Sequence, residues 1–193
     1  MRPAATLDDA GARAAVLREA DRVFYDRGVA AVGMAEIRDS SGVSLRRLYQ
    51  LYPSKRDLVA GWLAERHRTW TDWFAASVER HRAAGADPIL AAFDAIAEWA
   101  STPGFRGCAF LNTAAETSEI DETHRVVIAS HKRELIAYVA GLGRSAGYER
   151  ADVLAEQVAV LVDGAIVQAA VLASTRPVAA ARDAAARLVE TYR

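Results

Sequence analysis

Residues 40–56 read SSGVSLRRLYQLYPSKR, and the rest of the chain can be interpreted outward from them. The stretch contains four basic residues, Arg46, Arg47, Lys55 and Arg56, and no acidic residue. Serine, tyrosine and glutamine side chains, which can hydrogen-bond to phosphates and base edges, alternate with these charges. A basic patch with such donors is typical of nucleic-acid binding. Because basic runs are also common on solvated surfaces, the charge alone leaves both interpretations open.

The spacing around Gly42 predicts two short helices. A helix over residues 34–41, with Ile37 facing inward, would end at Gly42, since glycine readily adopts a positive φ after a helix. Ser44 is then a suitable N-cap for a second helix over residues 45–51. Two short helices joined by a glycine-containing turn, the second of them basic, are typical of a helix-turn-helix. In that motif the second helix lies in the major groove of DNA.

The second helix would pack Leu48 on the first and present its opposite face to the nucleic acid. The predicted DNA contacts are Ser44, Arg46, Arg47, Tyr49, Gln50, Tyr52 and Lys55. Either arginine can bind a guanine edge or a phosphate, and the sequence leaves open which of the two reads a base. Gln50 can pair with adenine, or it can simply face solvent.

A third, long helix is expected to follow directly. Pro53 ends the basic helix, because the residue before a proline is driven away from helical backbone angles. Ser54 and Asp57 are three residues apart and form a capping box for a helix over residues 55–81. Lys55 therefore lies at a helix N-terminus, where its charge and the free backbone N–H groups favour a bound phosphate.

Composition restricts the class of protein. The chain has 193 residues, of which 25% are charged and 52% hydrophobic, as in a globular domain with a proper core. Residues 1–68 carry a net charge of +3 and residues 69–193 a net charge of −4, so one end is suited to a polyanion. The single cysteine, Cys108, rules out an internal disulfide framework and fits a reducing compartment.

No secretory signal is visible at the N-terminus, and we expect a cytoplasmic protein. The most apolar run, residues 153–173, is interrupted by Glu156, Gln157, Asp163 and Gln168. Because charges near a helix centre are costly in lipid, this run favours a buried core or interface helix over a membrane span.

Helical spacing recurs along the whole chain, and no run alternates as a strand would, so the predicted fold class is all-α. The expected helices are residues 12–27, 34–41, 45–51, 55–81, 88–101, 105–117, 121–146, 150–174 and 177–192. We predict a three-helix DNA-binding domain over residues 1–54, with a frayed arm over residues 1–10. A six-helix bundle over residues 55–193 would follow.

The motif residues resemble one known family, the tetracycline-repressor-like (TetR/AcrR) transcriptional regulators. The resemblance covers residues 16–58 and is carried by Gly42-Val43-Ser44, Leu48-Tyr49 and Tyr52-Pro53-Ser54-Lys55. Beyond that stretch only the number and lengths of the helices are similar.

The chain departs from the family pattern at several positions. Arg46 and Arg47 stand where the family often has glycine or alanine with a small neighbour, which doubles the charge on the reading helix. Gly33 stands where a phosphate-binding hydroxyl is usual, and Arg38 and Ser41 replace small residues.

The resemblance implies a repressor that binds a palindromic operator as a homodimer and is released by a small, largely apolar effector. It places the dimer interface in the last two helices, about residues 150–192, and an effector pocket inside the C-terminal bundle. We also expect no cofactor and no catalytic or metal site, since Cys108 shares no metal-type spacing with any histidine.

Candidate pocket residues are aromatic or polar groups in the apolar helices of the bundle. They are Trp70, Phe74, Phe93, Trp99, Phe110, Asn112, His131, Asp163 and Gln168. A pocket needs a few polar groups among apolar ones, although each of these residues could equally be an ordinary core or surface residue.

Two further alternatives stay open. Cys108 could sense oxidants with its pKa lowered by Arg106, or it could be a small buried apolar residue on the helix with Ala109 and Phe110. The whole protein could also be an all-α carrier or enzyme with an incidental basic surface. No catalytic constellation or phosphate loop in the sequence supports that second reading.

Overall fold

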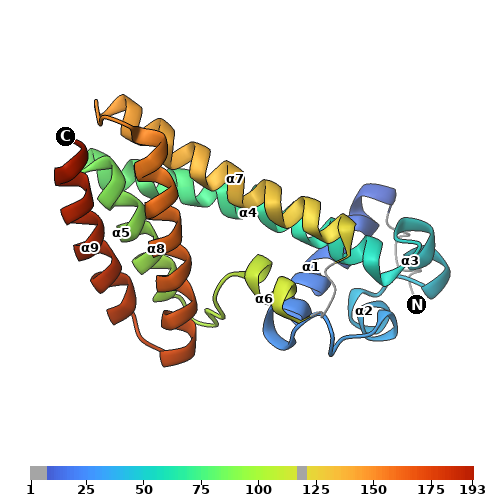
Figure 1. Ribbon diagram of the computed structural model, residues 1–193. Helices are drawn as coiled ribbons and strands as arrows, with labels where there is room; N and C mark the ends of the chain where they lie inside the picture. The colour runs from blue at the N-terminus through green and yellow to red at the C-terminus, as the bar shows by residue number, and fades with distance from the viewer. Residues whose placement is uncertain (1–7, 117–120) are drawn as a thin grey trace. The chain divides into compact units, whose positions relative to one another are not determined.

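The computed structural model describes residues 8–116 and 121–193, and all secondary structure within these ranges is helical. The helices are α1 (Asp9–Arg27), α2 (Met34–Ser41), α3 (Leu45–Leu51), α4 (Lys55–Ala83), α5 (Pro88–Ala100), α6 (Ala109–Ala115), α7 (Glu122–Ser145), α8 (Ala151–Leu172) and α9 (Arg176–Tyr192). Figure 1 shows them in chain order. The predicted all-α class is confirmed, as are the exact bounds of α2 and α3. Most of the predicted arm and the predicted helix end at Thr117 lie outside the described residues.

The chain forms two compact units. One consists of Met1–Arg66 with Ala109–Ile128, and the other of His67–Cys108 with Ala129–Arg193. Helices α4 and α7 each begin in the first unit and end in the second. This division differs from the predicted boundary at residue 54, so the assignment of functional domains remains a prediction.

The first unit is built on the packing of α1, α2 and α3 against one another. Asp8 caps α1 by accepting a hydrogen bond from the Gly11 backbone N–H at 2.7 Å. Apolar residues spaced along each helix, including Val16, Ile37 and Leu48, are fully buried at the centre. Burial of such side chains is what holds helices this short in place, because helices of seven or eight residues are not stable alone.

In the second unit α8 packs mainly on α9, and α5 packs on both (Figure 1). Alanines on the facing surfaces allow a close approach, and Arg182 of α9 donates to Asp94 of α5 at 2.7 and 3.2 Å. Helix α8 is long and apolar enough to cross a membrane by length and composition alone. This criterion is weak, since core helices of soluble proteins also meet it.

The sixth helix starts later than predicted. We expected a helix from residue 105, whereas α6 begins at Ala109. Gly104 and Gly107 have φ values of 79° and 81°, which interrupt a right-handed helix. Cys108 therefore precedes the helix instead of lying on it.

Candidate functional site

The turn between α2 and α3 has the geometry of a helix-turn-helix. Gly42 ends α2 in the left-handed region, with φ 70° and ψ 9°, which is strained for residues with a Cβ. Ser44 then caps α3 by accepting a hydrogen bond from the Arg47 backbone N–H at 3.3 Å. Leu48 is fully buried, as the sequence predicted, and Val43 and Leu51 are nearly so.

The opposite face of α3 is open to solvent. Ser44, Arg46, Tyr49 and Gln50 are all exposed there, and Tyr49 exposes 46% of its surface. Leu45 is also 40% exposed on this helix. This face thus combines one guanidinium, three hydrogen-bonding side chains and one apolar side chain.

The two neighbouring arginines are in different environments. Arg47 forms an ion pair with Asp9 in the first turn of α1, and it is half-buried. Arg46 is exposed and forms no ion pair within the described part of the chain. The structure therefore separates two residues that the sequence could not tell apart.

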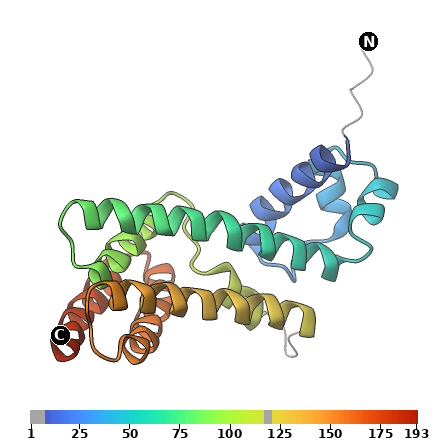
Figure 2. The ribbon, with the colours of Figure 1, turned by 90° about the horizontal axis from the view of Figure 1, so that it is seen from above.

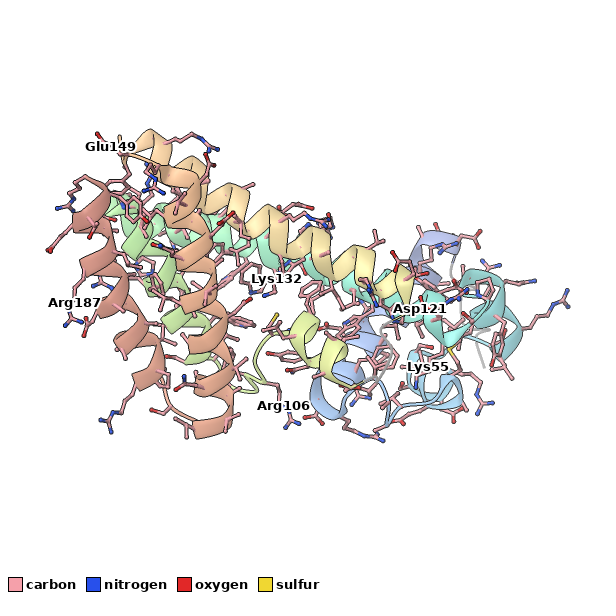
Figure 3. All side chains as sticks on the ribbon, viewed as in Figure 1. Lys55, Arg106, Asp121, Lys132, Glu149 and Arg187 are labelled. Atoms are coloured by element: carbon pink, nitrogen blue, oxygen red, sulfur yellow. The ribbon has the colours of Figure 1, made fainter. Side chains whose placement is uncertain are left out.

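The start of α4 has the predicted capping box. Ser54 Oγ accepts from the Asp57 backbone N–H at 3.2 Å and donates to the Asp57 carboxylate at 2.6 Å. Lys55, labelled in Figure 3, is the first residue of α4. Its side chain therefore leaves the backbone at a helix end with free N–H groups, a position that suits a phosphate.

Tyr52 was predicted to contact DNA, and the structure argues against this. The residue is only 6% exposed, and Arg13 lies over its ring at 5.5 Å. The ring packs so closely on α4 that a Cβ on Gly61 would lie 2.8 Å from it. Burial also raises the pKa of the Tyr52 hydroxyl. Tyr52 is thus a core residue that joins α3 to α4.

Asp21 joins α1 to α4 within the first unit. Its Oδ1 atom accepts hydrogen bonds from Trp62 Nε1 at 2.7 Å and from Arg66 Nη1 at 2.6 Å. Arg66 also stacks on Tyr25 with its guanidinium 3.7 Å from the ring centre. Helix α4 is therefore held against α1 by a charged side chain as well as by apolar contacts.

The second unit contains a small cavity between α4 and α7. It is lined by Trp70, Thr71, Phe74, His131, Leu135 and Tyr138 and has a volume of about 10 Å³. Figure 2 shows the two helices side by side, and ring contacts such as Phe74 to Tyr138 at 5.7 Å link them. A volume of this size admits about one water molecule.

Stacked rings form one wall of this cavity. Trp70 lies nearly parallel to Phe74 at a centroid distance of 4.8 Å. The rings of Trp99 and His131 approach Trp70 edge-on at 5.6 and 5.3 Å. Three of the predicted pocket residues, Trp70, Phe74 and His131, therefore line one cavity, and Trp99 supports it from behind.

His131 is the polar residue of that wall and carries no charge at neutral pH. It is 4% exposed, and its Nδ1 atom is 3.0 Å from His67 Nδ1. His67 is held in turn by Glu134, whose Oε2 atom is 3.0 Å from His67 Nε2. Burial, followed by the nearby Lys132 and His67, lowers the pKa of His131 to about 3.

The remaining predicted pocket residues lie elsewhere. Phe93 is fully buried on α5, Gln168 is exposed on α8, and neither lines the cavity. Phe110 and Asn112 belong to the first unit, so they are not part of this site. Asp163 accepts a hydrogen bond from Lys132 Nζ at 2.5 Å. It does not line the cavity, but Lys132 is the residue that follows the lining residue His131.

Cys108 has a different cationic neighbour from the one predicted. Its Sγ atom is 3.8 Å from the Nζ atom of Lys132, the residue labelled on α7 in Figure 3. The thiol is buried, so it resembles a small apolar residue more than an accessible sensor. The role expected of Arg106 beside this thiol stays a prediction.

Sequence reasoning missed Thr71, Leu135 and Tyr138 as lining residues. Leu135 and Tyr138 follow His131 by four and seven positions and therefore share its helix face. That spacing is visible in the sequence, but it does not show that the face meets Trp70 rather than solvent.

Comparison with known proteins agrees with this geometry. Residues 16–61 match the family model of bacterial regulatory proteins of the tetR family. A TetR-family transcriptional regulator from Streptomyces coelicolor is 25% identical, with a TM-score of 0.81 over 95% of this chain and 96% of that one. A search of curated proteins by sequence gave no match.

Two more distant structures share the fold. A TetR transcriptional regulator from Chloroflexus aurantiacus is 23% identical, with a TM-score of 0.78 over 94% of this chain and 96% of that one. The regulatory protein TetR from Rhodobacter sphaeroides is 18% identical, with a TM-score of 0.77 over 91% and 97% of the two chains.

The fold and the capped helix-turn-helix define the class as a DNA-binding transcriptional regulator. Within that class, residues 16–61 match the tetR family, and the whole chain has the fold of a solved TetR-family regulator.

Proposed function

We propose that this regulator is a cytoplasmic repressor that binds a palindromic operator as a homodimer and leaves it when a small effector binds. The observation that supports DNA reading by α3 is its open face, on which Arg46, Tyr49 and Gln50 are exposed while Leu48 is buried. Lys55 follows at the capped start of α4 and would bind a phosphate beside the reading helix.

The division of roles between the arginines follows from their partners. Arg46 is the base reader, because its side chain is exposed and can reach a guanine edge. Arg47 is held by Asp9, so it orients α3 on α1 and contacts at most a phosphate. Leu45, exposed beside them, suits the methyl group of a thymine.

An apolar stripe on α8 supports the homodimer. Val160, Gly164, Val167 and Val171 follow one another at spacings of four, three and four residues and therefore share one face. Val160 and Val171 are 74% and 78% exposed, which is costly in a helix that meets only water. A second copy of the chain would cover this face, with α9 beside it.

The dimer has a direct test. Val160→Glu combined with Val171→Glu should convert the protein to a monomer in sedimentation velocity, because four charges would be buried in the twofold interface. Val126→Glu, at an exposed valine on α7, is the matched control and should leave the mass unchanged. A monomeric wild-type protein at micromolar concentration would refute the proposed interface.

Release from DNA requires that the effector favour one arrangement of the dimer's two helix-turn-helix motifs over another. A ligand shifts such an equilibrium only by its difference in affinity for the two states. Helix α4 carries Lys55 in its first turn and the cavity residues Trp70 and Phe74 further along, so it is the natural connection between the two functions.

A gel shift on the DNA upstream of the protein's own gene, with a salt titration, tests the function. We expect specific binding that weakens steeply with salt, because phosphate contacts release counterions. Half-sites would be separated by one helical turn of about 34–36 Å, or by a multiple of it. Absence of binding to any duplex at low salt would favour a carrier with an incidental basic surface.

A further inference from the structure

The cavity wall contains a buried hydrogen-bond donor that lacks an acceptor. Trp70 Nε1 is inaccessible to solvent, and among the described residues no acceptor lies within hydrogen-bonding distance of it. The indole of Trp62 differs in this respect, since its Nε1 atom donates to Asp21 at 2.7 Å. Buried indole N–H groups usually find a partner, because an unpaired one loses its bond to water without replacement.

The lining of the cavity is uncharged. Its titratable members are His131, which is neutral because its pKa is lowered to about 3, and Tyr138, whose pKa is raised by burial. The nearby charged groups have polar partners: Lys132 pairs with Asp163 at 2.5 Å, and Glu134 Oε2 lies 3.0 Å from His67 Nε2. An ionised ligand would lose its hydration here without gaining a counter-charge.

The shape of the lining favours a flat ligand. Trp70 and Phe74 are stacked at 4.8 Å, and the ring of Tyr138 meets Phe74 at 5.7 Å, so three aromatic surfaces bound the space. A cavity needs roughly 150 Å³ to hold a benzene ring, so Leu135 and Tyr138 must move apart when one enters. That movement of α7 relative to α4 is the kind of change that an effector has to produce.

We propose that this site binds a neutral aromatic compound carrying a carbonyl-type acceptor, whose ring packs against Phe74 and Tyr138 and whose acceptor lies in the plane of the Trp70 indole and accepts a hydrogen bond from its Nε1 atom. The inference rests on the proposed ligand-responsive function and names the chemical class of its effector. An aromatic cation is the main competitor, since aromatic walls also attract cations. The unpaired N–H donor and the neighbouring Lys132 both disfavour it.

Indole resonances report on this site directly. The protein has four tryptophans, so a ¹⁵N-labelled sample gives four indole N–H signals that single Trp→Phe variants assign. We expect the Trp70 signal upfield of the Trp62 signal in the free protein, because only Trp62 has an acceptor. Acetophenone should move the Trp70 proton downfield in a saturable titration, whereas ethylbenzene, which has the same shape without an acceptor, should not.

Affinities of the same probes give the second readout. Trp70→Phe should weaken acetophenone binding by about fivefold more than ethylbenzene binding, because only acetophenone loses a neutral hydrogen bond. Trp73→Phe, at a partly exposed tryptophan on the same helix, is the matched control and should change neither. If Trp70→Phe fails to fold, the wild-type shifts decide, with Trp62, Trp73 and Trp99 assigned by their own variants.

The outcomes separate the site from the regulatory function. No saturable binding of acetophenone, equal responses to acetophenone and ethylbenzene, or tighter binding of benzyltrimethylammonium would each overturn the proposed class. Binding of acetophenone through Trp70 with no change in affinity for operator DNA would uphold the site and overturn the ligand-responsive function instead.

Discussion

Replacing Asp21 should loosen the attachment of α1 to α4. In Asp21→Ala, Trp62 Nε1 loses its acceptor at 2.7 Å while the ring remains 2% exposed, and an unsatisfied buried donor costs about 1–3 kcal/mol. The bond from Arg66 at 2.6 Å contributes less, about 0.5–1 kcal/mol, because the Asp21 side chain is 47% exposed and its charge is screened. We therefore expect the free energy of unfolding to fall by about 2–3 kcal/mol.

Urea denaturation followed by circular dichroism measures this change. For a chain of 193 residues the same loss should lower the midpoint of thermal unfolding by about 5–10 °C. Asp21→Asn retains an acceptor for Trp62 and should cost about half as much. Glu19→Ala is the matched control on α1, since its partner Arg22 is 64% exposed and such pairs contribute less than about 0.5 kcal/mol.

Two results would refute this reasoning. Unfolding of Asp21→Ala within about 0.5 kcal/mol of wild type would mean that the Trp62 donor finds another partner or water. Equal losses in the alanine and asparagine variants would mean that charge, rather than the acceptor for Trp62, holds the helices together.

Three further predictions follow from individual contacts. Arg46→Ala should cost about 1–3 kcal/mol at one operator position, whereas Arg47→Ala should weaken binding to all sequences alike; a panel of single-base operator variants separates the two, and the reverse pattern would exchange their roles. His131 has a folded pKa of about 3 against about 6.5 unfolded, so the unfolded chain binds the extra proton below pH 6.5 and stability falls as the pH drops. The free energy of unfolding should be about 2 kcal/mol lower at pH 5 than at pH 7.5, and His131→Gln should remove most of that difference; an unchanged slope in urea titrations of the variant would contradict the assignment. Gly61→Ala should destabilise the protein by about 1–3 kcal/mol despite the better helix propensity of alanine, because the new Cβ meets the Tyr52 ring at 2.8 Å; a higher melting temperature would contradict this.

Residues that begin or end helices allowed the helices of the first unit to be predicted well from the sequence. Gly42, Ser44 and the Ser54–Asp57 pair act through neighbouring backbone groups, so their effect on helix ends can be read without knowing the tertiary structure. Helix α6, by contrast, was placed too early because its start depends on a contact with a helix distant in the sequence. Gly107 adopts a positive φ where α8 approaches, and a Cβ at this position would lie only 3.2 Å from Ala170 Cβ. Such an approach leaves no trace in the local sequence.

Contacts between helices explain the residues that were misassigned. Tyr52 has a hydrogen-bonding side chain of the kind that contacts DNA, but Gly61 on α4 provides the space in which its ring is buried. The set of residues that line the cavity depends on which face of α7 packs against Trp70. Helical periodicity in the sequence identifies a face of a helix but does not show what packs against it. His131 was predicted as a polar pocket residue, whereas its support by His67 and Glu134 became visible only in three dimensions.

Every function proposed for this regulator depends on DNA binding by α3 and the start of α4. The most direct measurement is the salt dependence of binding to the DNA upstream of the protein's own gene, for wild type and for Lys55→Ala. Because Lys55 is expected to contact a phosphate, its loss should weaken binding to all sequences alike and reduce the slope of log K against log salt by about one. An unchanged affinity and slope in Lys55→Ala would contradict the phosphate contact. Failure of the wild-type protein to bind any duplex at low salt would contradict the account as a whole.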